Sequence, residues 1–419
     1  MNIALPFVHS VLLFALVYRV QQKHALFSAP LYWLTFLLKL IAAISVGLIY
    51  LFYYSVGDTW SYFAQATEMS ALARNDLPAY FQWIVDFNDR STVNHVFYLH
   101  DRSLLFVKVI SLLTLFTGNS YWICAAYFAT LSFFASWFLF KQLVAHVSES
   151  SQAATLALFF FPSILFWSSG LMKETLALSA IYFLSAIFVK VAYKQMILKS
   201  EWLLVFISIF MGWSLKYYWM AIFLVVLITS LIVLRISEKK SMSSTKLMLT
   251  WLGLFVAIGF VATLAHPNFY LSRILEVLVS SYDQFVLVSG SKGIIKFDGL
   301  EPTLTSLLAN SPWALFSGLY RPFVWEASSV LTFLASAENL FLMLLTILFL
   351  IHFRKNFRTF IFPLLTYAVV LCILLTISTP NLGTLSRYRI GFLPFLVFAL
   401  AYRNPLLNFL TKRISFLNK

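Results

Sequence analysis

About eleven apolar runs, separated by short polar stretches, constrain this chain more than any other feature of its sequence. The runs lie at about 4–20, 31–54, 121–145, 153–169, 173–193, 202–215, 218–234, 248–265, 332–352, 359–378 and 390–404. Most are long enough to cross a hydrocarbon layer of roughly 30 Å. Only 11% of the residues are charged, against roughly 25% in soluble domains, so water cannot surround these runs. The sequence therefore predicts an all-α, polytopic transmembrane helix bundle, with residues 1–419 as a single integral membrane domain.

The positions of lysine and arginine predict how this bundle is oriented. More than half of the 30 basic residues fall in alternate loops and at the C-terminus, which the positive-inside rule places in the cytoplasm. The alternation requires that the shorter run at 104–117 forms a re-entrant or interfacial helix that does not cross. The N-terminal run has no basic residue before it, so we interpret it as a retained first helix. The expected location is the inner (plasma) membrane of a bacterium.

Two longer loops, at about 55–120 and 266–331, are expected on the outer, periplasmic face. They carry most of the carboxylates, and the first is expected to contain interfacial helices. Basic residues lie in short clusters between apolar runs and not on one element, which argues against a nucleic-acid partner. His95 and His100 lack the spacing of a metal site, so a divalent metal is not indicated. Any chemistry is expected at the outer membrane–water boundary.

Asp58 is the first candidate for chemistry. It follows the long apolar run 31–54 in the segment GDTWSYFAQA, where Tyr62 and its neighbours predict a helix along the interface. An ionisable group at the mouth of a membrane helix is a functional candidate by default. The structural alternative is a solvated loop carboxylate or a helix cap.

The segment FFFPSILFWSSGLMKETLAL at 159–178 is the second candidate. Pro162 breaks or kinks one helix, the serines and glycine at 168–170 form a polar turn, and Lys173 and Glu174 open the next helix. Lys173 can hold a phosphate near this helix N-terminus, where free backbone N–H groups favour anions. The alternative is a simple ion pair between Lys173 and Glu174.

Arg387 and Arg389, on either side of Tyr388, form the third candidate, an anion clamp at the outer end of the last helix. The alternative is interfacial snorkelling of the two arginines. Residues two apart point roughly 200° away from each other on a regular helix. Either the last helix starts irregularly, or one arginine reaches an anion while the other packs or snorkels. Gly383 and Ser386 before the pair favour the irregular start.

Three further charged residues interrupt apolar surroundings. Lys216 lies inside the stretch 202–234 and predicts an outer hairpin or a cavity-facing lysine, because a buried lysine costs several kcal/mol unless it is paired. Arg321 and Glu326 lie among aromatic residues in GLYRPFVWEAS, which favours interface anchoring as much as substrate contact. The ionisable residues otherwise cluster at one face with little at mid-depth, which argues against a transporter.

Taken in order, these segments resemble the GT-C superfamily of membrane glycosyltransferases, which includes the protein mannosyltransferases and the lipid A aminoarabinose transferases. The resemblance covers residues 31–225 and 380–404. It rests on GDTWSYFAQA, GNS at 118–120, PSILFWSSGLMKE, GWSLKYY and RYRIGFLP. It implies a GT-C-like fold and the transfer of a sugar from a polyprenyl phosphate or diphosphate carrier to an acceptor glycan, lipid or protein on the outer face.

The resemblance also implies roles for the candidate residues. Asp58 would be the catalytic base or would orient the acceptor, and Arg387 and Arg389, assisted by Lys173, would bind the donor phosphate. The remaining candidates would contact substrate: Tyr62, Glu174, Lys216, Tyr388 and Arg321. The expected ligands are the lipid-linked sugar donor and membrane lipid, with no metal assigned. Two alternatives stay open, an O-antigen or exopolysaccharide polymerase or ligase without a catalytic carboxylate, and a transporter of lipid-linked sugars.

Overall fold

The computed structural model describes residues 4–22, 29–54, 57–86, 101–289, 293–353 and 357–411. These residues form helices and no β-strand, which confirms the predicted all-α class. Among them, eight helices are long and apolar enough to cross a membrane, or nine if the bent pair Leu382–Gly391 and Leu393–Ala401 is one span. The chain is therefore an integral multi-pass membrane protein.

The difference from about eleven predicted spans has two local causes. The run at 153–169 is divided at Phe161 and Pro162 into short helical pieces. The runs at 202–215 and 218–234 are two helical segments that join end to end in Lys199–Lys239, at a kink with non-helical dihedral angles at Lys216. The number of helices that actually cross stays a prediction.

The chain divides into two compact units, and each is described by itself. Unit 1 comprises Met1–Leu139, Leu165–Ser185 and Leu198–Tyr217, and unit 2 comprises Phe140–Ile164, Ala186–Ile197 and Tyr218–Lys419. The helices up to the middle of the chain are α1 (Ala4–Gln22), α2 (Ala29–Phe52), α3 (Asp58–Asn75), α4 (Leu77–Val85), α5 (Asp101–Thr117), α6 (Tyr121–His146), α7 (Ser151–Thr155), η1 (Leu156–Phe160), α8 (Pro162–Trp167), α9 (Lys173–Ala192) and α10 (Lys199–Lys239). The later helices are α11 (Ser244–Leu264), η2 (Pro267–Phe269), α12 (Leu271–Ser289), α13 (Leu304–Tyr320), η3 (Val324–Glu326), α14 (Val330–Ile351), α16 (Ile361–Ser378), α17 (Leu382–Tyr388), η4 (Arg389–Gly391), α18 (Leu393–Ala401) and α19 (Pro405–Thr411).

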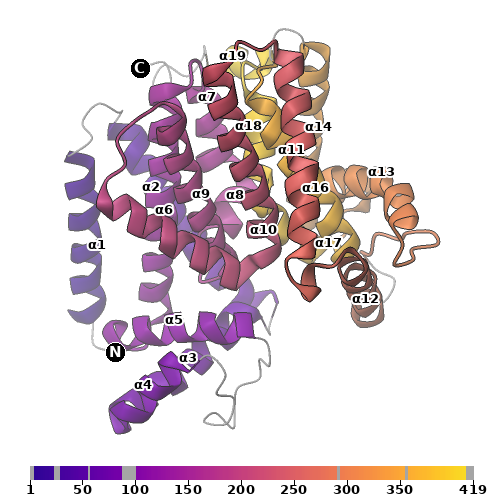
Figure 1. The fold of residues 1–419 in the computed structure, drawn as a ribbon. Helices are drawn as coiled ribbons and strands as arrows, with labels where there is room; N and C mark the ends of the chain where they lie inside the picture. Colours follow the sequence, from indigo (N-terminus) through magenta and orange to yellow (C-terminus); the bar gives the residue numbers. More distant parts are fainter. Residues whose placement is uncertain are drawn as a thin grey trace. The chain divides into compact units, whose positions relative to one another are not determined.

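Three helices of the first predicted outer loop form a layer in unit 1. α3 packs along α5 and against α4, and Figure 1 shows α5 running crosswise to α1. Asp76 caps α4 by accepting a hydrogen bond from the backbone N–H of Ala79 at 2.9 Å. None of the three is among the candidate spans. The segment contains these three helices, and its place outside the membrane and at the interface stays a prediction.

In unit 2, the second predicted outer loop contains helices α12 and α13, which both pack on α16. The backbone at 293–295 pairs with the backbone at 380–382, just ahead of α17. α17 and η4 meet α18 at a bend of 68°. The last apolar segment is therefore bent, but the bend follows Gly391, whereas Gly383 and Ser386 lie within the regular helix α17.

The predicted orientation can be tested with two engineered cysteines. Gln82 in α4 and Ser200 at the start of α10 are both exposed, whereas native Cys124 and Cys372 are buried and give little background. We expect a membrane-impermeant maleimide to label Gln82→Cys in intact cells, and Ser200→Cys only after the cells are permeabilised. Labelling of both positions from the same side would contradict the predicted topology.

Candidate functional site

A polar turn at 168–172, between α8 and α9, is held against α2 and α3 in unit 1. Gly170 is required at the closest approach, because an added Cβ would lie 2.5 Å from Val46 Cγ1. Thr59 in the first turn of α3 donates its hydroxyl hydrogen to the carbonyl oxygen of Leu171 at 2.8 Å. The turn therefore connects the start of α3 to the start of α9.

The predicted residues Asp58 and Lys173 lie at the two helix starts that this turn connects. Asp58 is the half-buried first residue of α3, and Gly57 occupies the N-cap position, so Asp58 is not the cap residue. A carboxylate in the first turn is favoured by the helix dipole. Thr59 follows Asp58 directly, and its partner Leu171 lies two residues before Lys173.

Lys173 contacts the start of α5. Its ammonium group donates a hydrogen bond to Ser103 Oγ at 3.1 Å and lies 4.8 Å from the ring centroid of Tyr62. The hydroxyl oxygen of Tyr62 is 3.4 Å from the same Oγ. The structure thus brings two predicted site residues together at Ser103, which the sequence did not single out.

Glu174 and Lys216 form an ion pair inside unit 1. The carboxylate oxygen of Glu174 lies 2.8 Å from Lys216 Nζ, and both side chains are buried. Lys216 has φ −143° and ψ 63°, so a kink in α10 and not a loop marks this position. Removing one partner of a buried pair leaves an uncompensated charge, so the pair links α9 firmly to α10.

Arg102 adds a third cation, which the sequence did not single out as a candidate. Its guanidinium lies 5.1 Å from the ring centroid of Tyr217, the residue after Lys216. The arrangement contains the three cations Arg102, Lys173 and Lys216 and the carboxylate of Glu174, with the carboxylate of Asp58 at the start of α3. Cations at the starts of α5 and α9 oppose the helix dipoles, whereas an anion would be stabilised there. Arg102, Lys173, Lys216 and Glu174, together with Tyr62 and Ser103, are called the unit 1 site. The site is suited to bind an anionic group.

A second lysine is buried in the middle of unit 1. Lys39 lies near the centre of α2 and donates hydrogen bonds to Ser132 Oγ at 2.9 Å and Ser168 Oγ at 2.5 Å. Because Ser168 begins the polar turn, Lys39 joins α2 and α6 to the segment that leads into α9. The lone lysine inside the apolar run 31–54 was the signal that sequence reasoning did not use.

In unit 2, Arg389 belongs to a buried network. Its side chain is 2% exposed and donates hydrogen bonds from Nη1 to the carbonyl oxygens of Leu319 at 3.1 Å and Gly318 at 3.4 Å. Nη2 donates to Asn339 Oδ1 at 2.9 Å and lies 3.9 Å from Glu338 Oε1. Arg389 therefore holds the bend before α18 against α13 and α14. Its predicted contact with a donor phosphate stays a prediction.

Glu338 is the other charge of this network, and sequence reasoning missed it. It lies within α14 and accepts hydrogen bonds from the Ser163 backbone N–H at 2.6 Å and from Ser163 Oγ at 2.5 Å. The break at Pro162 makes this N–H available, because α8 begins there. Lys39 and Glu338 both lie well inside candidate spans, so the expectation of little charge at mid-depth is wrong.

Arg387 differs from Arg389 in its surroundings. It is half-buried and its guanidinium lies 5.2 Å from the ring centroid of Tyr388. The structure thus separates the two arginines, with one packed inside and the other nearer the surface, as their helical spacing allowed. Arg387 remains the member of the predicted pair that is better placed to meet an anion.

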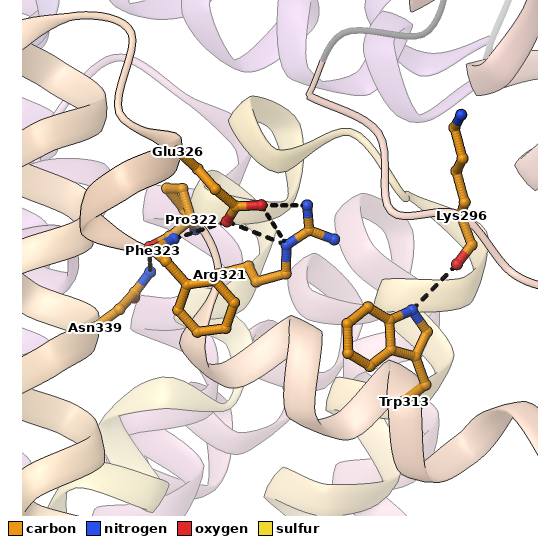
Figure 2. A network of polar contacts seen from close by, with 7 residues as sticks. All are labelled: Lys296, Trp313, Arg321, Pro322, Phe323, Glu326 and Asn339. Atoms are coloured by element: carbon orange, nitrogen blue, oxygen red, sulfur yellow. Dashed lines mark hydrogen bonds and ion pairs between the residues drawn. The ribbon is translucent and has the colours of Figure 1, made fainter.

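Arg321 and Glu326 form an ion pair in unit 2 (Figure 2). Nε of Arg321 donates to both carboxylate oxygens of Glu326, at 2.9 and 3.1 Å, and the backbone N–H of Phe323 donates to the same carboxylate at 2.8 Å. Burial alone would raise the pKa of Glu326, but the hydrogen bonds from Arg321 and Phe323 and the arginine charge lower it below its usual value. The carboxylate is therefore ionised at neutral pH.

Within the described ranges, no group of three His, Cys, Asp or Glu residues could hold a metal ion. His95 and His100 lie outside those ranges.

Family models, curated proteins and solved structures were compared with the chain, and none matches. A functional proposal therefore rests on the geometry of these sites and on the resemblance of the sequence segments.

Proposed function

We propose that this chain is a glycosyltransferase of the inner (plasma) membrane of a bacterium. It transfers a sugar from a polyprenyl-phosphate-linked donor to an acceptor glycan, lipid or protein on the outer face, in the assembly of cell-surface polysaccharide or glycoconjugate. The observation that carries this proposal is the unit 1 site. Its cations lie at the starts of α5 and α9, and the turn at 168–172 connects the start of α9 to the start of α3.

The cations at two helix starts support a phosphate ligand. Arg102 is the second residue of α5 and Lys173 is the first residue of α9, and both are half-buried and so can meet a ligand. Phosphate oxygens accept charge-assisted hydrogen bonds from arginine and lysine and from free backbone N–H groups at helix starts. Lys216 is neutralised by Glu174, so the role of Lys216 is to hold the start of α9 in place.

The position of the site in the fold supports a lipid-linked ligand. α9 is a candidate span that begins at Lys173, whereas α3 and α5 are not candidate spans. A phosphate whose apolar chain stays in the bilayer would reach the end of a span and not its middle. Tyr62 and Tyr217 suit this depth, because tyrosine is enriched where apolar and aqueous layers meet.

Asp58 would supply the base for the reaction. It would accept the proton of an acceptor hydroxyl while that oxygen attacks the anomeric carbon. The bond from this carbon to the carrier phosphate oxygen would break at the same time. Arg102 and Lys173 would stabilise the charge that appears on the departing polyprenyl phosphate.

The proposal predicts that binding of a polyprenyl phosphate depends on the unit 1 site. We expect Arg102→Gln and Lys173→Gln each to weaken binding by about tenfold, because a charged hydrogen bond contributes about 1.5–3 kcal/mol. Binding can be measured in detergent micelles by native mass spectrometry. Lys199→Gln removes the same charge from an exposed position in α10 and is expected to match the parent.

Two outcomes would contradict this prediction. Either Arg102→Gln and Lys173→Gln bind the polyprenyl phosphate as the parent does, or the parent binds the corresponding polyprenol, which lacks the phosphate, equally well. The first outcome would move the phosphate site to unit 2, where Arg387 is the next candidate.

Transport of a lipid-linked sugar is a second candidate, because of charges that sequence reasoning overlooked. Lys39 and Glu338 lie well inside candidate spans, and helical segments are interrupted at Pro162 and at the bend before α18. Charges at this depth and discontinuous helices are typical of transporters. An assay on detergent-solubilised protein distinguishes the two functions. A glycosyltransferase still transfers sugar in detergent, whereas transport cannot be observed because no second compartment exists.

A further inference from the structure

A strip of four aromatic side chains runs along one part of unit 2, and we call Trp313, Phe316, Phe323 and Trp325 the aromatic strip. Neighbouring ring centroids are 6.1 Å apart for Trp313 and Phe316, 6.0 Å for Phe316 and Phe323, and 4.7 Å for Phe323 and Trp325. Trp313, Phe316 and Trp325 are 43%, 42% and 81% exposed. The strip is therefore continuous and open along most of its length.

The two ends of the strip are held in fixed orientations. Trp313 Nε1 donates a hydrogen bond to the carbonyl oxygen of Lys296 at 3.1 Å, and the guanidinium of Arg321 lies 5.9 Å from the centroid of the indole (Figure 2). At the other end, Phe323 stacks on Trp325, and the Phe323 backbone donates to Glu326. A ligand would meet a surface that is already ordered, which reduces the entropy lost on binding.

Charged groups of both signs border the strip. The guanidinium of Arg321 lies over the ring of Trp313, and its Nη1 carries no hydrogen bond to any described residue. Its partner Glu326 supplies a carboxylate next to Phe323 (Figure 2). This ion pair is neutral overall, so it gives the strip no positive excess with which to select an anionic lipid headgroup.

We infer that the aromatic strip is the binding surface for the glycan chain of the acceptor. The apolar C–H face of a sugar ring stacks on an indole or phenyl ring, because these rings present large flat apolar surfaces. Hydroxyl groups both donate and accept hydrogen bonds, which matches a border of cations and carboxylates. A row of rings fits successive sugar units of an extended chain. This inference rests on the proposed transfer function, because it specifies the acceptor of that reaction.

The test measures binding of the lipid-free polysaccharide released by mild acid from the envelope of cells that make this protein. Purified full chain in detergent is titrated, and the affinity is measured by calorimetry. We expect Trp325→Ala to weaken binding by about tenfold, since one aromatic stacking contact contributes up to about 1.5 kcal/mol. Trp325→Phe keeps a stacking ring and should restore most of the affinity. Trp202→Ala removes a tryptophan that is 62% exposed in unit 1 and should match the parent.

Three outcomes would overturn the inference. The parent binds no polysaccharide, or Trp325→Ala binds it as the parent does, or Trp202→Ala loses as much affinity as Trp325→Ala. Unchanged glycan affinity of Trp325→Ala would leave the strip with the role of an interfacial anchor. The glycan-binding assay contains no donor and needs no turnover. Its result therefore does not depend on whether the protein binds a polyprenyl phosphate. Conversely, normal donor binding without glycan binding would reject only the acceptor surface.

Discussion

Replacing Arg389 with methionine is expected to destabilise unit 2 by about 3–5 kcal/mol, the usual range for breaking a buried ion pair. The change keeps the side chain long and apolar but removes the donors to the Leu319 carbonyl and to Asn339 Oδ1. It also leaves the buried carboxylate of Glu338 with only the Ser163 hydrogen bonds. The stability of purified protein against thermal unfolding in detergent measures the effect.

A second variant shows whether the loss comes from the charge pair. Arg389→Met combined with Glu338→Gln removes both charges, so we expect it to be less destabilised than the two single changes together. Arg387→Met removes the same charge from a half-buried position two residues earlier and should change stability by less than about 1 kcal/mol. Equal loss in Arg387→Met and Arg389→Met would contradict the structural role assigned to Arg389.

Replacing Asp58 with asparagine is expected to reduce sugar transfer by about 10²–10⁴-fold while the protein folds and inserts normally. Asparagine keeps the size of the side chain, and losing one charge from the first turn of α3 costs only about 0.3–1 kcal/mol. The sugar is unidentified, so the measurement is the consumption of endogenous lipid-linked sugar, followed by mass spectrometry of lipids extracted from membranes that carry each variant.

Glu68→Gln is the matched control, because Glu68 is an exposed carboxylate on the same helix and should tolerate the change. Polyprenyl phosphate binding by Asp58→Asn should equal that of the parent, since the phosphate contacts are assigned to Arg102 and Lys173. Near-native turnover by Asp58→Asn would remove this residue from the mechanism. It would favour a polymerase or ligase that relies on arginines without a carboxylate.

Several features of the fold could be predicted because they depend on neighbouring residues alone. Long apolar runs with few charges require helices in lipid, where every backbone polar group must be satisfied within the segment. The polar turn before Lys173 and the opening of α9 at this residue follow from the break at Pro162 and the serines and glycine after it.

The division of the apolar runs was less predictable from composition. Hydropathy treats 153–169 as one stretch, although the chain inserts a π-helix at η1 and breaks at Pro162. Hydropathy separates the two halves of α10 at Lys216, and two helical segments meet there at a kink. Composition gave no sign that Lys216 would pair with Glu174 from α9 at this kink.

The class of this protein and the candidate residues Asp58, Lys173 and Glu174 at the starts of α3 and α9 could be read from local sequence, because run length, charge scarcity and turn residues act locally. Which charges meet depends on the packing of the helices. This packing paired Glu174 with Lys216, gave Lys39 its two serine hydroxyls, and turned Arg389 inward to Asn339 while Arg387 stayed nearer the surface. A charge in an apolar environment is tolerated only where partners from other helices reach it, and those partners are set by packing between segments far apart in the chain.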